Sequence, residues 1–367
     1  MEQSGSGILT VVGGGLAGCE AAWQAARHGL KVILYEMRPG VMTPAHTGGG
    51  LAELVCSNSL GSALADRPSG LLMEEMQLLG SLLVACAKKA ALPAGGALAV
   101  DRKRFSELVS QAIKSERGIE LRNAEITAIP EGLTVIASGP LTSPSLTAEL
   151  SRLTGEENLF FYDAIAPIVT AESIDMHIAF RASRFNREKS GTGDYINCPL
   201  DEAKYQRFIS ELLGAERIPL KDFEGQINEG VKAGAGDFFE GCLPVEVMAG
   251  RGPNSLAFGP MRPIGLRDPR TGKRPHAVVQ LRQDDLGASL YNLVGFQTNL
   301  TFPEQERVLR MIPGMEKAEF VRHGQMHRNT YLASPRLLEK TLCYRGRPNL
   351  LFAGQLVGVE GYLGNIA

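Results

Sequence analysis

Two cysteines lie in sequence contexts that suit nucleophilic chemistry. Cys56 is followed by the polar segment Ser-Asn-Ser, and residues of this type commonly cap helices, whose N-termini favour the thiolate form of a nearby thiol. Cys242 stands between Gly241 and a Leu-Pro pair, where Glu240 and Glu246 offer carboxylates for proton transfer. Both are candidate nucleophiles, although a free cysteine is most often a buried packing residue. We expect that packing role for Cys19, Cys86, Cys198 and Cys343.

A glycine-rich turn near the N-terminus suits phosphate binding. The pattern Gly13-x-Gly15-x-x-Gly18 lies between an apolar, β-branched run at 8–12 and an Ala-rich segment at 19–28 that predicts a helix. A second strand is predicted at 31–35 and leads into Glu36, as in a dinucleotide-binding β–α–β unit. There the glycines permit a tight turn and close approach to the pyrophosphate, and the acid accepts from the ribose hydroxyls. The candidate cofactor-binding residues are Gly13, Gly14, Gly15, Leu16, Ala17, Gly18 and Glu36.

The identity of the dinucleotide is not set by this turn alone, because FAD and NAD share it. The turn lies at the extreme N-terminus, and a strand predicted at 350–353 would complete the same sheet from the other end of the chain. This arrangement favours FAD, whose long isoalloxazine end needs to be held by segments far along the chain.

Charge is distributed unevenly along the chain. The whole sequence has a formal net charge of −2, yet residues 262–347 contain 15 Lys and Arg against 8 Asp and Glu. Such an excess indicates either a surface that faces a polyanion or an ordinary solvated surface. Within it, a loop rich in Pro and Gly has the extended character that suits phosphate contacts. Its candidate RNA-binding residues are Arg262, Arg267, Arg270, Lys273 and Arg274.

The elements that must position these residues fall into two groups. The first 145 residues alternate strands and helices: beyond the turn, we expect an ordered loop at 43–62, helices at 70–90 and 101–114, and strands at 119–129 and 133–137. From about 145 to 320, short strands, Gly/Pro turns and helices at 199–213 and 303–312 indicate an inserted domain. We therefore expect a first domain of residues 1–145 and 321–367 and an inserted substrate domain of residues 146–320.

Length and composition exclude several classes of protein. A chain of 367 residues that is 44% apolar and 21% charged is neither disordered nor fibrous, and it has room for about two domains. No run of about 18 apolar residues or signal peptide is found, so we expect a cytoplasmic protein without a membrane segment. No C-x-x-C pair occurs among the six cysteines, so no metal site is expected.

Ten segments together are more specific than any single motif. They include 52–60 around Cys56, 239–246 around Cys242, 258–266, 326–331 and the Gly-Val-Glu-Gly-Tyr sequence at 358–362. In these segments and their order the chain resembles the TrmFO family, the folate- and FAD-dependent tRNA (uracil-5-)-methyltransferases, over about residues 8 to 362. That family is related to flavoproteins of the glucose-inhibited division type. It continues beyond the last motif with a helix and several dozen residues, so the resemblance implies that a C-terminal part is missing here.

The resemblance implies an α/β fold: a Rossmann-like, GR2-like FAD-binding domain with an inserted α+β domain that binds tRNA. It also implies an activity, in which the methylene carbon of 5,10-methylenetetrahydrofolate is transferred to C5 of the T-loop uridine and is reduced to a methyl group with FAD and NAD(P)H. Cys56 and Cys242 would be the catalytic thiols, with the division of labour between them open. His327, Arg328 and Tyr331 would stack against and hold the folate or the flavin.

Three alternatives remain open at this level. The first is a related enzyme that methylates uridine in ribosomal RNA. The second is a flavin oxidoreductase that acts on a small molecule, which the charge asymmetry and the two cysteine motifs disfavour. The third is a truncated flavoprotein without activity that has kept only RNA binding.

Overall fold

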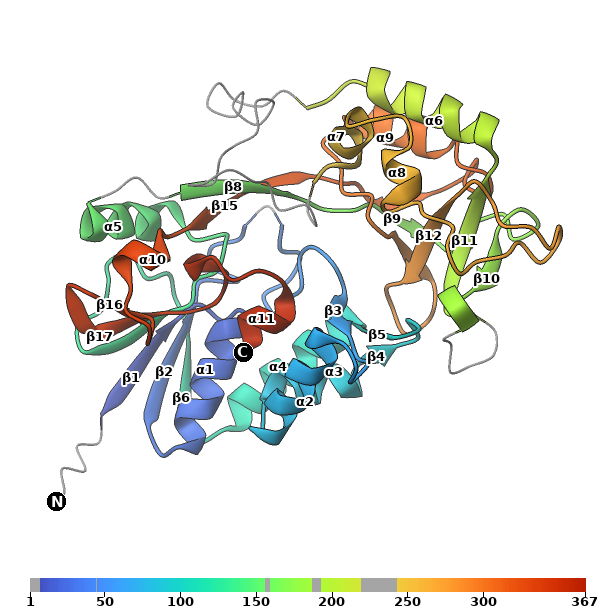
Figure 1. Cartoon of the computed structure of the whole chain (residues 1–367). Coiled ribbons are helices and arrows are strands. Elements are labelled where there is room, and N and C mark those ends of the chain that lie inside the picture. Colours follow the sequence, from blue (N-terminus) through green and yellow to red (C-terminus); the bar gives the residue numbers. More distant parts are fainter. Residues whose placement is uncertain (1–6, 44, 156–158, 187–192, 219–242) are drawn as a thin grey trace.

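The computed structural model describes residues 7–43, 45–155, 159–186, 193–218 and 243–367. The chain forms two domains, each built on a six-stranded sheet (Figure 1). No single helix in these ranges is long and apolar enough to cross a membrane; only α2 (Pro68–Leu78) and α3 (Leu82–Lys89) taken together, across a bend of 113°, have the length and composition.

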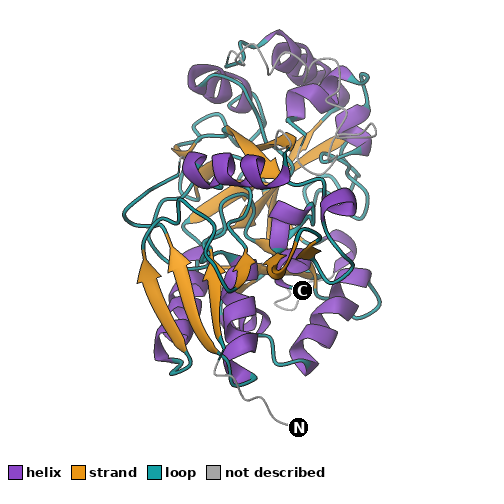
Figure 2. Ribbon diagram, turned by 90° about the vertical axis from the view of Figure 1, so that its left-hand side faces the viewer, coloured by secondary structure: helices purple, strands orange, loops and turns teal. Residues whose placement is uncertain are grey.

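The first sheet has the strand order β16-β17-β7-β1-β2-β6. Its strands are β1 (Ile8–Val12), β2 (Lys31–Glu36), β6 (Ile119–Asn123), β7 (Leu133–Ile136), β17 (Arg347–Phe352) and β16 (Cys343–Tyr344). All neighbours pair in parallel except β16 and β17. The strand predicted near the C-terminus therefore does complete the sheet begun at the N-terminus. Figure 2 shows these strands side by side with helices packed against them.

Helices α1 (Leu16–Arg27), α2 (Pro68–Leu78), α3 (Leu82–Lys89) and α4 (Arg102–Ser115) bury apolar side chains in one cluster with β1 and β2. The single helix expected at 70–90 is wrong: Gly80 has a φ of +77° and the Ser81 side chain caps a new helix by accepting from the Val84 N–H. The strand expected at 119–129 ends at Asn123, and the loop expected at 43–62 ends in β3 (Ser59–Ser62). β3 pairs with β5 (Ala97–Val100), which also pairs with β4 (Ala91–Leu92).

The second sheet has the order β10-β11-β12-β13-β9-β14 and is antiparallel throughout. Its strands are β9 (Ile168–Thr170), β10 (Phe180–Ala182), β11 (Tyr195–Leu200), β12 (Ala277–Gln283), β13 (Leu290–Leu293) and β14 (Phe320–Arg322), with η1 (Arg184–Asn186) between β10 and β11. Helices α6 (Glu202–Gly214), α7 (Val245–Gly250), α8 (Ser255–Phe258) and α9 (Phe302–Leu309) pack on one face.

Side chains alternate along the strands of this second sheet. Val279 and Leu281 of β12 join the apolar core beneath the helices, whereas Gln280 and Arg282 lie on the opposite face. That face is polar and yet buried, because the first domain lies against it: Arg282 donates to the Asn58 side chain.

Two long strands connect the domains. β8 (Leu159–Ala164) and β15 (Met326–Tyr331) pair antiparallel along six residues (Figure 1). One helix directly precedes this ribbon in the sequence and three follow it. All four pack against elements of the first domain: α5 (Pro144–Thr154), α10 (Ser334–Leu337) and η4 (Gly354–Val357) pack with β7 and β17. The last, α11 (Tyr362–Ile366), packs with α1. We propose that the ribbon is the domain boundary, which assigns α5 to the first domain and β14 to the inserted domain.

Candidate functional site

A cavity opens at the carboxyl ends of β1 and β2, over the N-terminus of α1. Its described lining includes Gly13–Ala17 of the fingerprint but not Gly18, together with the acid Glu36 and with Tyr362 and Asn365 of α11. Ligands of doubly wound sheets bind at this edge, because the helix N-terminus presents free N–H groups there. The structure thus brings Gly13–Ala17 and Glu36 together around one cavity, whereas Gly18 serves the packing of α1.

Three glycines shape the turn between β1 and α1. Gly13 has a φ of +109°, and a Cβ there would lie 2.4 Å from the Ala137 carbonyl oxygen. A Cβ on Gly18 would lie 1.8 Å from the Gly13 carbonyl oxygen, so only glycine lets the helix pack this closely. A Cβ on Gly15 would meet no atom within 4 Å, which leaves open space at the first turn of α1. No acidic side chain stands in that turn to repel an anion.

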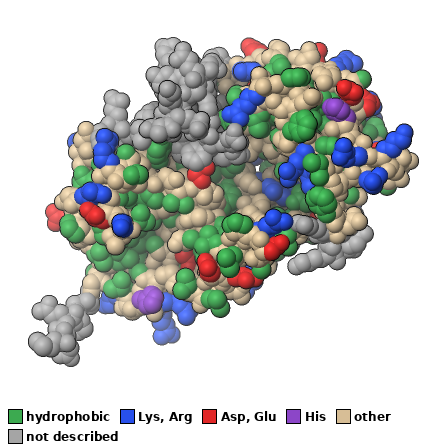
Figure 3. Space-filling view, viewed as in Figure 1, with side chains coloured by type: hydrophobic (Ala, Val, Ile, Leu, Met, Phe, Trp, Pro, Cys, Tyr) green, Lys and Arg blue, Asp and Glu red, His purple; other side chains and the backbone are tan. Residues whose placement is uncertain are grey.

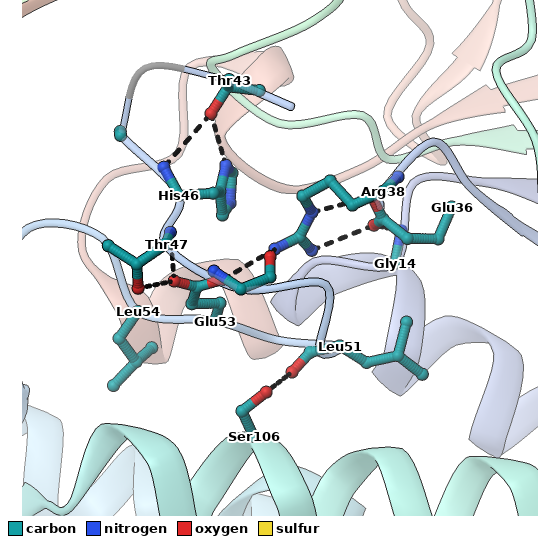
Figure 4. A network of polar contacts seen from close by, with 12 residues as sticks. Gly14, Glu36, Arg38, Thr43, His46, Thr47, Leu51, Glu53, Leu54 and Ser106 are labelled. Atoms are coloured by element: carbon teal, nitrogen blue, oxygen red, sulfur yellow. Dashed lines mark hydrogen bonds and ion pairs between the residues drawn. The ribbon is translucent and has the colours of Figure 1, made fainter. Parts of the chain in front are cut away.

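Glu36 lies at the end of β2 and is tied to the protein itself (Figure 4). Its carboxylate accepts from the Gly14 N–H at 2.9 Å, from the Arg38 N–H at 2.9 Å and from the Arg38 guanidinium at 2.9 and 3.2 Å. Burial alone would raise the pKa of Glu36, but the hydrogen bonds and charge of Arg38 outweigh it and lower the pKa. A ribose hydroxyl would have to share this carboxylate with Arg38.

Arg38 is a site residue that the sequence motifs do not identify. The residue is only 2% exposed, and its Nη1 atom donates to Glu53 at 3.0 Å. Glu53 in turn accepts from the Thr47 N–H and hydroxyl at 2.8 Å, and the Thr43 hydroxyl lies 2.5 Å from His46 Nδ1 (Figure 4). One buried arginine therefore joins the ribose end of the cavity to the loop that leads to Cys56. An arginine two residues after the acid that ends a strand is the only sequence signal for this role.

Cys56 lies in this loop, half-buried, just before β3. The expected helix after Ser57-Asn58-Ser59 is absent, since the segment runs into a strand; the helix-cap argument for Cys56 is wrong. Instead, the N–H groups of Cys56 and Ser57 donate to the Tyr362 hydroxyl at 2.8 and 3.1 Å. Because Tyr362 lines the cavity, the backbone of Cys56 is held at the edge of the cofactor site.

Arginines from three elements supply the positive charge around Cys56. Arg102, at the start of α4, donates to the Cys56 carbonyl at 3.2 Å and pairs with Asp284 at 3.1 Å. Arg282 of β12 donates to the Ser57 hydroxyl at 2.7 Å. Burial lowers the pKa of Arg282 and that of Arg322 in β14. A negative charge on Cys56 would raise both pKa values and so acts against this shift. Arg282 and Arg322 are therefore near enough to the Cys56 thiol to interact with a charge on it.

The second candidate thiol, Cys242, lies outside the described residues, as does Glu240. Glu246, at the first turn of α7, is described and is 1% exposed. It accepts from the Thr298 hydroxyl and the Asn299 N–H, both at 2.8 Å, and burial raises its pKa. A raised pKa suits a carboxyl group that exchanges a proton, although here its oxygens are engaged in holding the 298–299 segment.

His327, Arg328 and Tyr331 lie on β15 of the connecting ribbon, where they pair with Asp163, Tyr162 and Leu159. The structure gives the backbone of the first two only, and Tyr331 is half-buried, with a pKa raised by burial. Tyr331 is not among the described residues that line the cofactor cavity.

The five basic residues predicted to bind RNA lie between α8 and β12 of the inserted domain, and all five are exposed. They are not equivalent. Arg270 pairs with Asp268 at 2.7 Å, and Arg267 donates to the Gly272 carbonyl at 3.2 Å. Lys273 and Arg274 make no side-chain hydrogen bond or ion pair with any residue described here, and their charges are uncompensated. Arg262 lies close enough to Arg184 to help lower its pKa to about 10, an effect due first to burial.

Comparison with known proteins places these features in a family. The model of the glucose inhibited division protein A family matches residues 8–367. A protein from Synechococcus sp. (strain JA-3-3Ab), "Methylenetetrahydrofolate--tRNA-(uracil-5-)-methyltransferase TrmFO", is 56% identical over 96% of this chain and 76% of its own length. Proteins of the same name from Pelotomaculum thermopropionicum and Geobacter sulfurreducens are 56% and 54% identical over 98% of this chain, which spans 79% and 80% of their lengths.

A solved structure of Aquifex aeolicus GidA has the same fold. It superimposes with a TM-score of 0.71 and 15% identity over 98% of this chain and 61% of the Aquifex chain. At this identity the likeness concerns the fold alone, a Rossmann-like flavoprotein architecture with an inserted domain. The present chain thus spans about three quarters of the curated relatives that it matches and somewhat less of the Aquifex protein. On the strength of the family match and of the TrmFO relatives, this chain belongs to the glucose inhibited division protein A family and, within it, to the TrmFO group.

Proposed function

We propose that this protein is a folate- and FAD-dependent tRNA (uracil-5-)-methyltransferase. It transfers the methylene carbon of 5,10-methylenetetrahydrofolate to C5 of the T-loop uridine of tRNA, forming 5-methyluridine, with NAD(P)H as the reductant. The observation that carries the proposal is the placement of Cys56 at the edge of the dinucleotide cavity, fixed there by Tyr362, in a chain of the TrmFO group. Since its substrate is tRNA, we place the enzyme in the cytoplasm.

The residues around the cavity fit FAD. The open first turn of α1 suits the pyrophosphate, and the carboxylate of Glu36 lies where the adenosine ribose is expected. Asn365 adds a further point of attachment: it is 8% exposed, and its Oδ1 has no hydrogen-bond partner among the described residues although it lines the cavity. Such an orphaned acceptor suits an N–H group of the cofactor. When bound, FAD supplies the electrons that reduce the transferred carbon and takes them from NAD(P)H.

The chain's own contribution to the chemistry is activation of the uracil. C5 of a neutral uridine is a poor nucleophile. Addition of a thiolate to C6 raises the electron density at C5, which can then attack the carbon delivered by the folate. Loss of the C5 proton, cleavage of the bond between the transferred carbon and its carrier nitrogen, reduction of that carbon by the two electrons that bound FAD would supply, and departure of the thiolate would then give 5-methyluridine. We propose Cys56 and Cys242 for the two thiol tasks, attack on the uracil and assistance at the flavin; the arginines around Cys56 suit either task.

The remaining predicted residues complete the proposal. His327, Arg328 and Tyr331 hold the folate or the flavin from the connecting ribbon. Arg262, Lys273 and Arg274 contact phosphates of the tRNA, and Arg267 and Arg270 contribute less because their guanidinium groups already have partners.

The activity is tested with tRNA that lacks 5-methyluridine and with methylenetetrahydrofolate labelled at the methylene carbon. The purified, FAD-loaded protein should transfer the label to the T-loop uridine in the presence of NAD(P)H. A tRNA transcript with cytidine in place of that uridine serves as the control. Label in ribosomal RNA but not in tRNA, or no transfer by protein that retains FAD, would overturn the proposal.

A further inference from the structure

A second cavity lies on the inserted domain and shares no lining residue with the cofactor cavity in the described part of the chain. It is bounded by the start of α6, by the end of α8 and by the loop that leads from Pro263 to His276. Three of the predicted RNA-binding residues, Arg270, Lys273 and Arg274, line it. None of the chemistry assigned to the cofactor site uses this cavity.

An aromatic ring stands at the edge of the cavity. Phe258, the last residue of α8, is 82% exposed, and neighbouring Ile264 is 50% exposed. A single exposed apolar side chain is ordinary on a protein surface. An exposed ring beside unpaired cations is a more specific combination, because it offers one face for stacking and charges for the anion attached to whatever stacks. Figure 3 shows Lys and Arg side chains beside exposed hydrophobic ones on the lobe formed by the inserted domain.

The ionic side chains that line the cavity have a net positive charge. Lys204 pairs with Asp201 at 3.5 Å, and Arg270 pairs with Asp268 at 2.7 Å. Of the other ionic side chains around it, Glu202 is acidic and Lys273 and Arg274 are basic. The two basic side chains are exposed and come from one loop, so both can reach a single anionic group at the rim.

His276, whose ring has a buried nitrogen, also lines the cavity. His276 Nε2 is inaccessible to solvent and has no hydrogen-bond partner within the described ranges. Its ring packs against Tyr205 with the centroids 5.0 Å apart. A buried polar atom without a partner is costly, and an imidazole nitrogen can donate to or accept from a ligand. A nucleobase presents both donors and acceptors on its edge.

We propose that this cavity binds one nucleotide of the RNA substrate, at a site separate from the reacting uridine. The base stacks on Phe258 with its edge toward His276 at the wall of the cavity, and Lys273 and Arg274 hold an adjoining phosphate. Unpaired bases stack on aromatic side chains in this manner in RNA-binding proteins. The inference rests on the proposed function, since it takes tRNA as the substrate. It adds an anchor that positions the tRNA while the T-loop uridine reaches the cofactor site.

Fluorescence can test the stacking directly. The chain has one tryptophan, Trp23, in the first domain, so Phe258→Trp adds a single reporter at the cavity. Titration with unmodified tRNA should quench the added fluorescence as the base stacks. Leu213→Trp is the control, because Leu213 is exposed on α6 but does not line the cavity. Equal quenching of both reporters, or none at position 258 under conditions where tRNA is bound, would overturn the inference.

Affinity measurements test the phosphate contact and separate the two proposals. Lys273→Ala with Arg274→Ala should raise the Kd for tRNA and reduce the log–log salt slope by about 0.7 to 0.9 per lost phosphate contact. Phe258→Ala should raise the KM for tRNA and leave kcat at saturating tRNA unchanged. Arg207→Ala, an exposed cation of α6 outside the cavity, should change neither value. If the parent binds no tRNA, the proposed function fails; if the parent binds tRNA and these variants match it, only the nucleotide site fails.

Discussion

At the scale of the residue, the pairing of Glu36 with Arg38 has two consequences for function. It orients the carboxylate toward the cofactor cavity, and it keeps a buried guanidinium neutralised. Removing Glu36 therefore affects more than a ribose contact. We expect Glu36→Ala to lose FAD on dialysis and to lower the free energy of unfolding by about 3 kcal/mol, because Glu53 is then the one acidic partner left to Arg38 among the described residues. Flavin absorbance after dialysis and urea denaturation measure the two effects. Retention of parental flavin content would refute the ribose assignment.

The same pair predicts a pH dependence. The folded-state pKa of Glu36 lies below the ordinary 4.5, so its charge contributes stability above about pH 4.5. That contribution is lost as the pH falls through the lowered pKa, since the unfolded chain binds the proton more readily. Urea denaturation between pH 5 and pH 3 should therefore show a shallower loss of stability for Glu36→Gln than for the parent. The reason is that the variant takes up about one proton fewer than the parent when it unfolds. Parallel curves for parent and variant would contradict this.

Differences among the thiols predict their order of reaction. Cys19 and Cys198 are fully buried, and burial raises the pKa of Cys198 to about 12; Cys86 is also buried, with a raised pKa. Cys56 is half-buried and lies among arginines. Limited iodoacetamide treatment at pH 7 should modify Cys56 before these three, as judged by mass spectrometry of the digest. Prior modification of Cys86 or Cys198 would count against an activated Cys56.

Mutation tests the same assignment. Cys56→Ala and Cys242→Ala should each abolish methyl transfer while flavin content and circular dichroism remain those of the parent. Cys86→Ala, the matched control, should lower stability without changing turnover per folded molecule. Near-parental turnover in both of the first two variants would exclude a covalent role for either thiol.

At the scale of the element, the loop that carries Cys56 is held from two sides. Tyr362 accepts from its N–H groups, and Arg102 bridges the Leu54 and Cys56 carbonyls to Asp284 of the inserted domain. A displacement of about 1 Å in a reacting group can cost about 10²-fold in rate. We expect Arg102→Met to lower kcat for methyl transfer by about this factor and to leave bound FAD in place. Arg104→Met, on the exposed face of the same helix, should have parental activity.

The elements around the fingerprint were predictable because their signals are local. Apolar runs at 8–12 and 31–35, with glycines at 13, 15 and 18, predict the β1–α1–β2 unit almost to the residue. The break between α2 and α3 was not predictable, because the apolar periodicity of the sequence continues on both sides of the bend at Gly80. The Ser-Asn-Ser segment after Cys56 suits a helix cap as well as a strand edge, and its actual partner, Arg282, is more than 200 residues away. Contacts of this kind depend on the tertiary fold.

At the scale of the whole molecule, the main apolar core of the inserted domain is separate from those of the first domain, and a largely polar boundary lies between them. The helices of the inserted domain pack on their own sheet, and the helices of the first domain pack on theirs. Between them lie polar contacts, in which Asn58 donates to the Gln283 carbonyl and the Gly95 N–H donates to Asp194, and one small apolar cluster, in which Tyr195 packs on Leu92, Ala94 and Ala99. Interfaces of this type couple domains less strongly than a shared apolar core. The two domains should therefore respond differently to loss of the cofactor.

Calorimetry tests this difference. Because the cofactor cavity is lined by first-domain residues, FAD stabilises that domain by binding its folded form, by about 2.7 kcal/mol when free FAD is a hundred times its Kd. Removal of FAD should lower the Tm of one of two transitions, and the other should keep its Tm. Proteolysis of the flavin-free protein at a temperature between the two transitions should then leave the inserted domain protected, including the cavity that contains Lys273 and Arg274. A single transition that shifts as a unit would show that the polar boundary couples the domains fully, so that folding of the RNA-binding surface and binding of the flavin depend on one another.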